Sequence, residues 1–374
     1  MKSELLKIAE VIVSQAVDGE QVEVVAVHGT ETDIRVYQGD IESFTAAESQ
    51  GVGIRVVQDG RQGMAYAGSL DVDVLNETLE EARDNAAFGT PDEFQGIAEP
   101  DGVESVPLEL LDSSLADFAN EEKIALAIEL ERSILQSDSR IIGVESTDYV
   151  DSITTSAIVT STGIHRANQE GGCYVAASSL ASDGVDTQTG FGYSVGRSPT
   201  QLDVAKASSD ATERATRLLG AKKAESGRMT VILDPYVTAQ FLGIIGSTLS
   251  GEALLKGRSL FADREGDQVA PNFLTLIDDP TDVNAFTATE ADGEGLASRR
   301  NTLIDQGALS GFLHNSYTAR ALGTSSTGSA VRSFNSSPGA GPLALMLTPG
   351  IHSQSELIEQ VGEGMLCLLY TSPS

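Results

Sequence analysis

Histidine, the commonest protein ligand of a catalytic metal, occurs in this sequence without a recognisable metal-binding spacing. The four histidines are His28, His165, His314 and His352. None has a second His or a Cys three to five residues away, whereas two ligands on one helix face require such a spacing. No local zinc motif is therefore present, and we interpret each histidine as a turn or surface residue.

Nucleophilic side chains are present, but no activating base lies near them in the sequence. Cys173 lies in an expected strand between Gly172 and Tyr174, which favours a buried, small hydrophobic residue. The hydroxyl-rich run 323–329 could present backbone N–H groups to an anion or a carbonyl. We favour the interpretation of this run as a flexible polar loop.

Two acidic clusters, 278–282 and 290–294, are the remaining candidates for binding a cation. Neither has the regularly spaced Asp or Asn residues and the closing Glu of a calcium loop. Because the chain contains 55 Asp and Glu residues, clusters of this kind arise by chance. We interpret both as solvated loops.

The composition limits the possible partners and compartment. The chain has 374 residues and 24 Lys and Arg, so its formal net charge is 24 − 55 = −31. Such a charge disfavours direct binding to a nucleic-acid backbone, which requires clustered basic residues. With two cysteines, no apolar leader and no long apolar run, we expect no disulfide framework, no secretory signal and no membrane partner. The sequence predicts a cytoplasmic protein.

Hydrophobic periodicity predicts the elements that must position these residues. Apolar positions at helical spacing predict helices over 3–18, 72–87, 116–136, 201–219 and 236–249. Short runs of period two predict strands at 22–27, 34–37, 41–45 and 53–57, with turns at Gly29-Thr30, Gly39-Asp40 and Asp59-Gly60. About four further strands are expected between 141 and 193, and a strand at 230–233 precedes a loop-rich region.

The predicted fold class is α+β, with an antiparallel sheet and flanking helices in the N-terminal region, followed by a β-rich C-terminal domain. The order helix, antiparallel strands, helix occurs twice, so the two units could be analogous halves of one layer. The predicted divisions are an N-terminal α+β unit at 1–90, a linker or surface loop at 91–115, a central α+β unit at 116–222, a β-rich C-terminal domain at 227–366 and a tail at 367–374.

Several segments resemble the TldD/PmbA family. They are GVGIRVVQDGRQGMAY at 51–66, LKGRSLF at 255–261, RRNTLIDQG at 299–307 and FLHNSYTAR at 312–320. The similarity extends from about residue 20 to residue 366. Members of this family are described as zinc metallopeptidases and as modulators of DNA gyrase, with paired TldD-type and PmbA (TldE)-type subunits.

The resemblance implies that this chain is the subunit without a metal. Catalytic members carry HExxxH on a helix before the segment matched at 255–261, which supplies two zinc ligands and a glutamate base. In the corresponding helix, 240–252, Gly243, Ile244 and Ser247 stand at about those positions, and none can perform either role. No catalytic or metal-binding residue and no cofactor is therefore assigned here, and zinc is expected in the TldD-type partner.

Three hypotheses about function follow. The first is a non-catalytic subunit of a zinc metallopeptidase that processes or degrades small or unfolded polypeptides, with Gly243, Gly246 and Ser247 contacting a substrate tunnel or the partner. These glycines could equally permit tight packing within this chain. The second is an acidic binding protein that modulates DNA gyrase. The third is a self-sufficient hydrolase that uses Ser326 or Cys173.

The resemblance also predicts an incomplete C-terminal domain. It ends at about Leu366, and the residues 367–374 look like translated sequencing adapter. The apolar run 365–370 would then leave an unpaired sheet edge.

Overall fold

The structure, a computed structural model, describes residues 1–222 and 225–368. Its N-terminal part alternates helices with long strands. The elements, in order, are α1 (Lys2–Val13), β1 (Glu20–Tyr37), β2 (Asp40–Gln58), β3 (Arg61–Ala67), α2 (Val72–Phe88), α3 (Ser113–Ala116), α4 (Asn120–Ser137), β4 (Ile141–Thr160), β5 (His165–Ser182), β6 (Thr187–Gly196), the 3-10 turn η1 (Pro199–Gln201) and α5 (Val204–Arg217).

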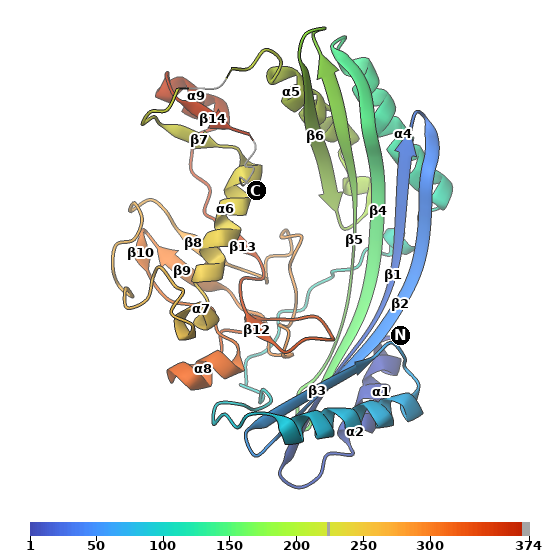
Figure 1. Cartoon of the computed structure of the whole chain (residues 1–374), viewed down its shortest axis with the longest axis vertical. Coiled ribbons are helices and arrows are strands. Elements are labelled where there is room, and N and C mark those ends of the chain that lie inside the picture. Colours follow the sequence, from blue (N-terminus) through green and yellow to red (C-terminus); the bar gives the residue numbers. More distant parts are fainter. Residues whose placement is uncertain (223–224, 369–374) are drawn as a thin grey trace.

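The six strands of this part form one antiparallel sheet in the order β3-β2-β1-β4-β5-β6 (Figure 1). Two units, each built of a helix, three strands and a helix, meet in this sheet. They join where β1 pairs with β4, from Glu23↔Thr160 to Val36↔Thr147. This pairing confirms the α+β class and the expectation that the two units belong to one layer.

The helices cover one face of the sheet, and strand periodicity separates that face from the other. Val24, Ala26 and Ile34 of β1 are fully buried in the cores beneath the helices. Val25 and Val27, which point to the opposite side, line a cleft. Successive residues of this part of β1 therefore alternate between the core beneath the helices and the cleft on the opposite side.

Two of the expected sheet details are wrong. Gly29-Thr30 is not a turn, because Gly29 pairs with Ser49 on one side and Thr154 on the other, inside an 18-residue strand. Three strands, not four, occupy 141–196, since β4 and β5 continue for 20 and 18 residues. Pairing on both sides keeps glycine-containing segments extended. Positive φ angles confirm the turn expected at Asp59-Gly60, whereas the turn expected at Gly39-Asp40 lies one residue earlier, at Gln38 and Gly39.

One edge of the sheet is open over part of its length. Strand β3 pairs with β2 only along Val52–Gln58, and residues 40–50 of β2 are exposed.

Helix α1 ends at Val13, earlier than the expected 3–18, because the chain must turn before β1 begins at Glu20.

The C-terminal part contains short elements joined by long loops, and it faces the concave side of the sheet (Figure 1). Its core includes Leu249, Leu276, Leu303 and Leu313. The elements are β7 (Val231–Leu233), α6 (Pro235–Thr248), α7 (Gly251–Leu255), β8 (Leu276–Asp278), β9 (Asn301–Asp305), β10 (Ala308–Leu309), α8 (Ser316–Leu322), β11 (Ala330–Val331), β12 (Gly339–Ala340), β13 (Leu345–Leu347), α9 (Gln354–Val361) and β14 (Met365–Cys367).

Two segments outside these cores bear on the expected divisions of the chain. In the segment expected as a linker or surface loop, Ile97, Ala98 and Leu110 are buried, so these residues are not on the surface. Strand β14 pairs in parallel with β7, and residues 369–374 of the expected tail lie outside the described residues. No helix in the described ranges combines the length and apolar content needed to cross a bilayer.

Candidate functional site

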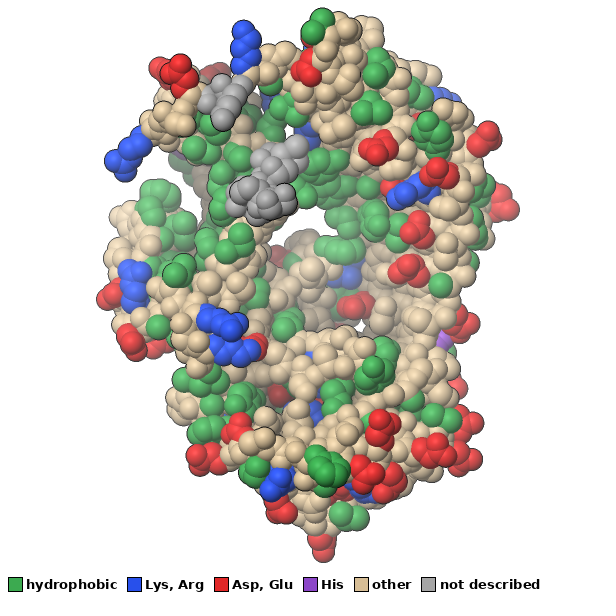
Figure 2. Space-filling model, in the orientation of Figure 1, with side chains coloured by type: hydrophobic (Ala, Val, Ile, Leu, Met, Phe, Trp, Pro, Cys, Tyr) green, Lys and Arg blue, Asp and Glu red, His purple; other side chains and the backbone are tan. Residues whose placement is uncertain are grey.

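A cleft of about 690 Å³ separates the concave face of the sheet from the C-terminal part. Figure 2 shows the molecule hollowed at this position. Strands β1, β4 and β5 form its floor, and loops around 286–293, 330–334 and 342–343 form its walls. The site therefore combines residues that lie far apart in the chain.

The register of β4 and β5 makes the cleft floor polar. The facing pairs are Ser152↔Gly172, Thr154↔Glu170 and Ser156↔Asn168, and all six residues line the cleft. Hydroxyl, amide and carboxylate groups on neighbouring strands can form hydrogen bonds with an extended chain.

Two phenylalanines hold the walls against the sheet at positions where it carries glycine. A Cβ on Gly172 would lie 2.6 Å from Cζ of Phe286, and a Cβ on Gly53 would lie 1.7 Å from the carbonyl oxygen of Phe334. Only glycine permits these approaches. Arg197, after β6, supports the first wall by donating to the carbonyl oxygens of Leu110, Ala285 and Phe286.

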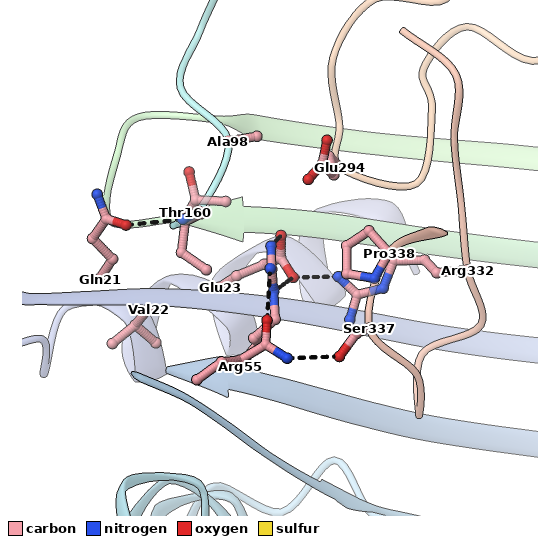
Figure 3. A network of polar contacts seen from close by, with 12 residues as sticks. Gln21, Val22, Glu23, Arg55, Ala98, Thr160, Glu294, Arg332, Ser337 and Pro338 are labelled. Carbon is pink, nitrogen blue, oxygen red and sulfur yellow. Dashed lines mark hydrogen bonds and ion pairs between the residues drawn. The ribbon is translucent and has the colours of Figure 1, made fainter. Parts of the chain in front are cut away.

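A buried ion-pair network joins the sheet to the loop around 330–334, which forms the second wall of the cleft (Figure 3). Arg55 of β2 binds both carboxylate oxygens of Glu23 at 3.0 Å, and Arg332 binds the same carboxylate from the C-terminal part. Burial opposes ionisation of Glu23, yet the two guanidinium groups lower its pKa to about 2. The carboxylate is therefore charged at neutral pH. The Nη2 atom of Arg332 is buried without a hydrogen-bond partner.

The interpretation of the acidic clusters as solvated loops is wrong for four residues, since Asp278, Asp279, Asp292 and Glu294 are all buried. Asp278 accepts hydrogen bonds from the backbone N–H groups of residues 343 and 344. Asp292 accepts from the N–H groups of residues 294, 296 and 330. These carboxylates satisfy backbone donors that have no sheet partner in a loop-rich region.

Burial raises the pKa of Asp278 to about 6 and that of Asp292 to about 7. A carboxyl group whose pKa is raised on folding binds its proton more tightly in the folded state. Its contribution to stability is therefore full below the unfolded pKa near 4 and falls as the pH rises to about 7. We expect the free energy of unfolding to decrease over this interval.

Replacing Asp278 by asparagine should flatten this pH dependence and stabilise the protein by about 1–3 kcal/mol at pH 8. Oδ1 accepts both backbone hydrogen bonds, while Oδ2 is buried without a hydrogen bond, so the amide keeps the contacts and removes the charge. Urea unfolding at pH 5 and pH 8 measures the effect. Asp84→Asn, at an exposed site on α2, is the control. An unchanged difference between the two pH values in Asp278→Asn would contradict the assignment.

The other candidate residues are distributed over several sites. Cys173 is buried, as expected, and burial raises the pKa of its thiol to about 12. His314 is also buried, so its interpretation as a turn or surface residue is wrong, and burial lowers its pKa. Ser326 donates to the carbonyl oxygen of His314, and among the described residues no histidine or carboxylate side chain forms a hydrogen bond with its hydroxyl. This arrangement does not support the third hypothesis, a self-sufficient hydrolase that uses Ser326 or Cys173.

The three residues proposed on helix α6 face different surroundings. A Cβ on Gly246 would lie 2.8 Å from Leu345 and 3.1 Å from Pro342, which agrees with tight packing inside this chain. Gly243 has open space around it and Ser247 is exposed. Ile244 beside them is 56% exposed. Their contact with a substrate or partner stays a prediction.

The sequence did not identify the cleft residues Glu170, Arg197, Phe286 and Phe334. The alternation of Asn168, Glu170 and Gly172 along β5 indicates a shared face, but not what covers it.

Models of known protein families match both the N-terminal and the C-terminal part of the chain. Three domain models described as the PmbA/TldA metallopeptidase domain 1, central domain and C-terminal domain match residues 22–86, 113–219 and 226–372. The chain belongs to the TldD/PmbA family. The third match extends six residues beyond the expected end of the similarity at 366.

Relatives and solved structures of this family agree with the fold. "Metalloprotease PmbA" of Escherichia coli O157:H7 is 26% identical over 316 residues, which cover 84% of this chain and 69% of that protein. A candidate modulator of a DNA gyrase from Thermotoga maritima has a TM-score of 0.88 at 24% identity, and TldE from Thermococcus kodakarensis has 0.87 at 21%. Each comparison covers 99% of this chain and 83% of the solved chain.

The residues of this TldD/PmbA chain do not fit the zinc ion of a metallopeptidase. Among the described residues, no three His, Cys, Asp or Glu side chains are placed to bind one metal. Helix α6, where the resemblance places HExxxH, offers Gly243, Ile244 and Ser247 instead. We derive no metal-dependent step in this chain.

Proposed function

We propose that this chain is a non-catalytic, PmbA/TldE-like subunit of a cytoplasmic zinc metallopeptidase complex that acts on small or unfolded polypeptides. A TldD-type subunit would supply the zinc site. The observation that carries the proposal is the absence of metal ligands and of a base on α6 in a chain matched by all three domains of the family.

The cleft gives this subunit a role besides assembly. Its polar floor and apolar walls can hold an extended polypeptide through main-chain hydrogen bonds, which do not require a particular substrate sequence. We place the partner contact at the exposed face of α6 formed by Gly243, Ile244 and Ser247.

The acidic surface supports this function more than an imitation of DNA. Figure 2 shows Asp and Glu side chains scattered over the visible face, with Lys and Arg among them. Imitation of a phosphate backbone requires carboxylates aligned along one face.

Reconstitution tests the proposal. The purified chain alone should bind no stoichiometric zinc and should not cleave unfolded peptides. Addition of a TldD-type subunit from the same source should produce cleavage that a chelator abolishes, and size-exclusion chromatography should show a joint complex. Stoichiometric zinc in the isolated chain, together with chelator-sensitive proteolysis, would contradict a non-catalytic role.

A further inference from the structure

Glu170 differs from the other charged side chains that line the cleft in making no hydrogen bond or ion pair, although the charge of Arg197 acts on it. Four charged residues line the cleft in the described part of the chain. Arg197 donates to three carbonyl oxygens, Arg332 pairs with Glu23, and Asp292 accepts three backbone N–H groups. No hydrogen bond or ion pair joins the carboxylate of Glu170 to another described residue.

Glu170 is solvent-exposed on the floor of the cleft and makes no hydrogen bond with its neighbours there. The carboxylate lies on the floor opposite Thr154, between Asn168 and Gly172 on its own strand. Desolvation raises the pKa of Glu170, while the charge of Arg197 lowers it in part. An exposed carboxylate that accepts no hydrogen bond from the protein can accept one from a cation that enters the cleft.

We propose that Glu170 is the counter-ion for a positively charged group of a polypeptide held in the cleft. The group would be a Lys or Arg side chain or an N-terminal ammonium. This inference rests on the proposed function, because it assumes that the cleft holds peptides. Main-chain contacts alone would accept any sequence, so Glu170 gives the cleft a preference for basic segments.

Fluorescence anisotropy on the full chain tests the preference. The probes are a labelled, unstructured peptide with blocked ends and one central Lys, and the same peptide with Gln in place of Lys. The Lys peptide should bind about tenfold more tightly, as expected for one charge-assisted contact. Glu170→Gln should abolish this difference, so that the two peptides bind the variant equally.

Two further variants separate the local charge from general effects. Glu77→Gln, at an exposed position on α2, removes the same charge away from the cleft and should keep the tenfold preference. Glu170→Lys should reverse the selectivity in favour of a peptide with a central Glu. Circular dichroism and the unfolding midpoint establish that each variant is folded.

Several results would overturn the inference. Equal binding of the Lys and Gln peptides to the unmodified chain would refute the role of Glu170 while leaving peptide binding by the cleft intact. If the Glu170→Gln variant still prefers the Lys peptide, that result also refutes the role of Glu170 and leaves peptide binding by the cleft intact. Complete displacement of the Lys peptide by an equal concentration of butylamine would reassign the site to free amines. Failure of both peptides to bind would refute the proposed role of the cleft together with this inference, whereas reconstituted cleavage tests the subunit role separately.

Discussion

Replacing Glu23 by alanine should destabilise the protein by about 3–5 kcal/mol, because the substitution leaves two buried guanidinium groups facing each other. Arg55 and Arg332 both bind this carboxylate, and the side chains of all three residues are at most 3% exposed. Arg332 comes from the C-terminal part, so its attachment to the sheet should weaken as well. Urea unfolding at pH 7 measures the loss.

Glu129→Ala is the matched control for this prediction. Glu129 pairs with Arg132 on the exposed surface of α4, where an ion pair contributes less than about 1 kcal/mol. A similar loss in both variants would show that the burial of the network contributes little. Because the pKa of Glu23 is lowered to about 2, its stabilisation is full above pH 4.5 and is lost only as the pH falls towards 2.

Gly53→Ala should separate the second wall of the cleft from the sheet. The added Cβ would overlap the carbonyl oxygen of Phe334, which belongs to the backbone and cannot rotate away. We expect a loss of about 3 kcal/mol, at the upper end of the range for overpacked sites. Limited proteolysis should cut the loop around 330–334 faster than in the unmodified chain.

Gly243→Ala provides the comparison for the second prediction. This glycine lies within α6 and has open space around it, so alanine should stabilise the helix by about 0.5–1 kcal/mol. An unchanged unfolding midpoint and cleavage rate in Gly53→Ala would show that the loop tolerates displacement.

Local periodicity was sufficient to predict the helices that cover the sheet. In α2, Leu75, Leu79, Ala82 and Ala86 are buried at helical spacing, as expected for 72–87. Strand ends were harder to predict, because Gly29 looks like a turn until pairing with β2 and β4 on both sides is known. Tertiary pairing decided this segment, not the propensity of its residues.

The candidate site depended on contacts between residues distant in the sequence. Asp278 looked like part of a solvated acidic loop because its donors, near residue 344, lie 66 residues away. Pairing of β5 with β6 brings Arg197 near Glu170, whereas the loop at Phe286 joins them only after the C-terminal part has folded onto the sheet. No local pattern encodes such neighbours. The missing metal ligands on α6, by contrast, were visible from the sequence once the family was recognised.

The network around Glu23 has a consequence for the order of folding during synthesis. Glu23 and Arg55 are 32 residues apart and can pair once the first hairpin forms, whereas Arg332 follows Glu23 by 309 residues. Contacts between such distant residues form late, because the ribosome must first deliver the intervening chain. The cleft floor, including Val25 and Val27, therefore stays open to solvent in the nascent protein. The excess of acidic residues would keep neighbouring nascent chains apart during this interval.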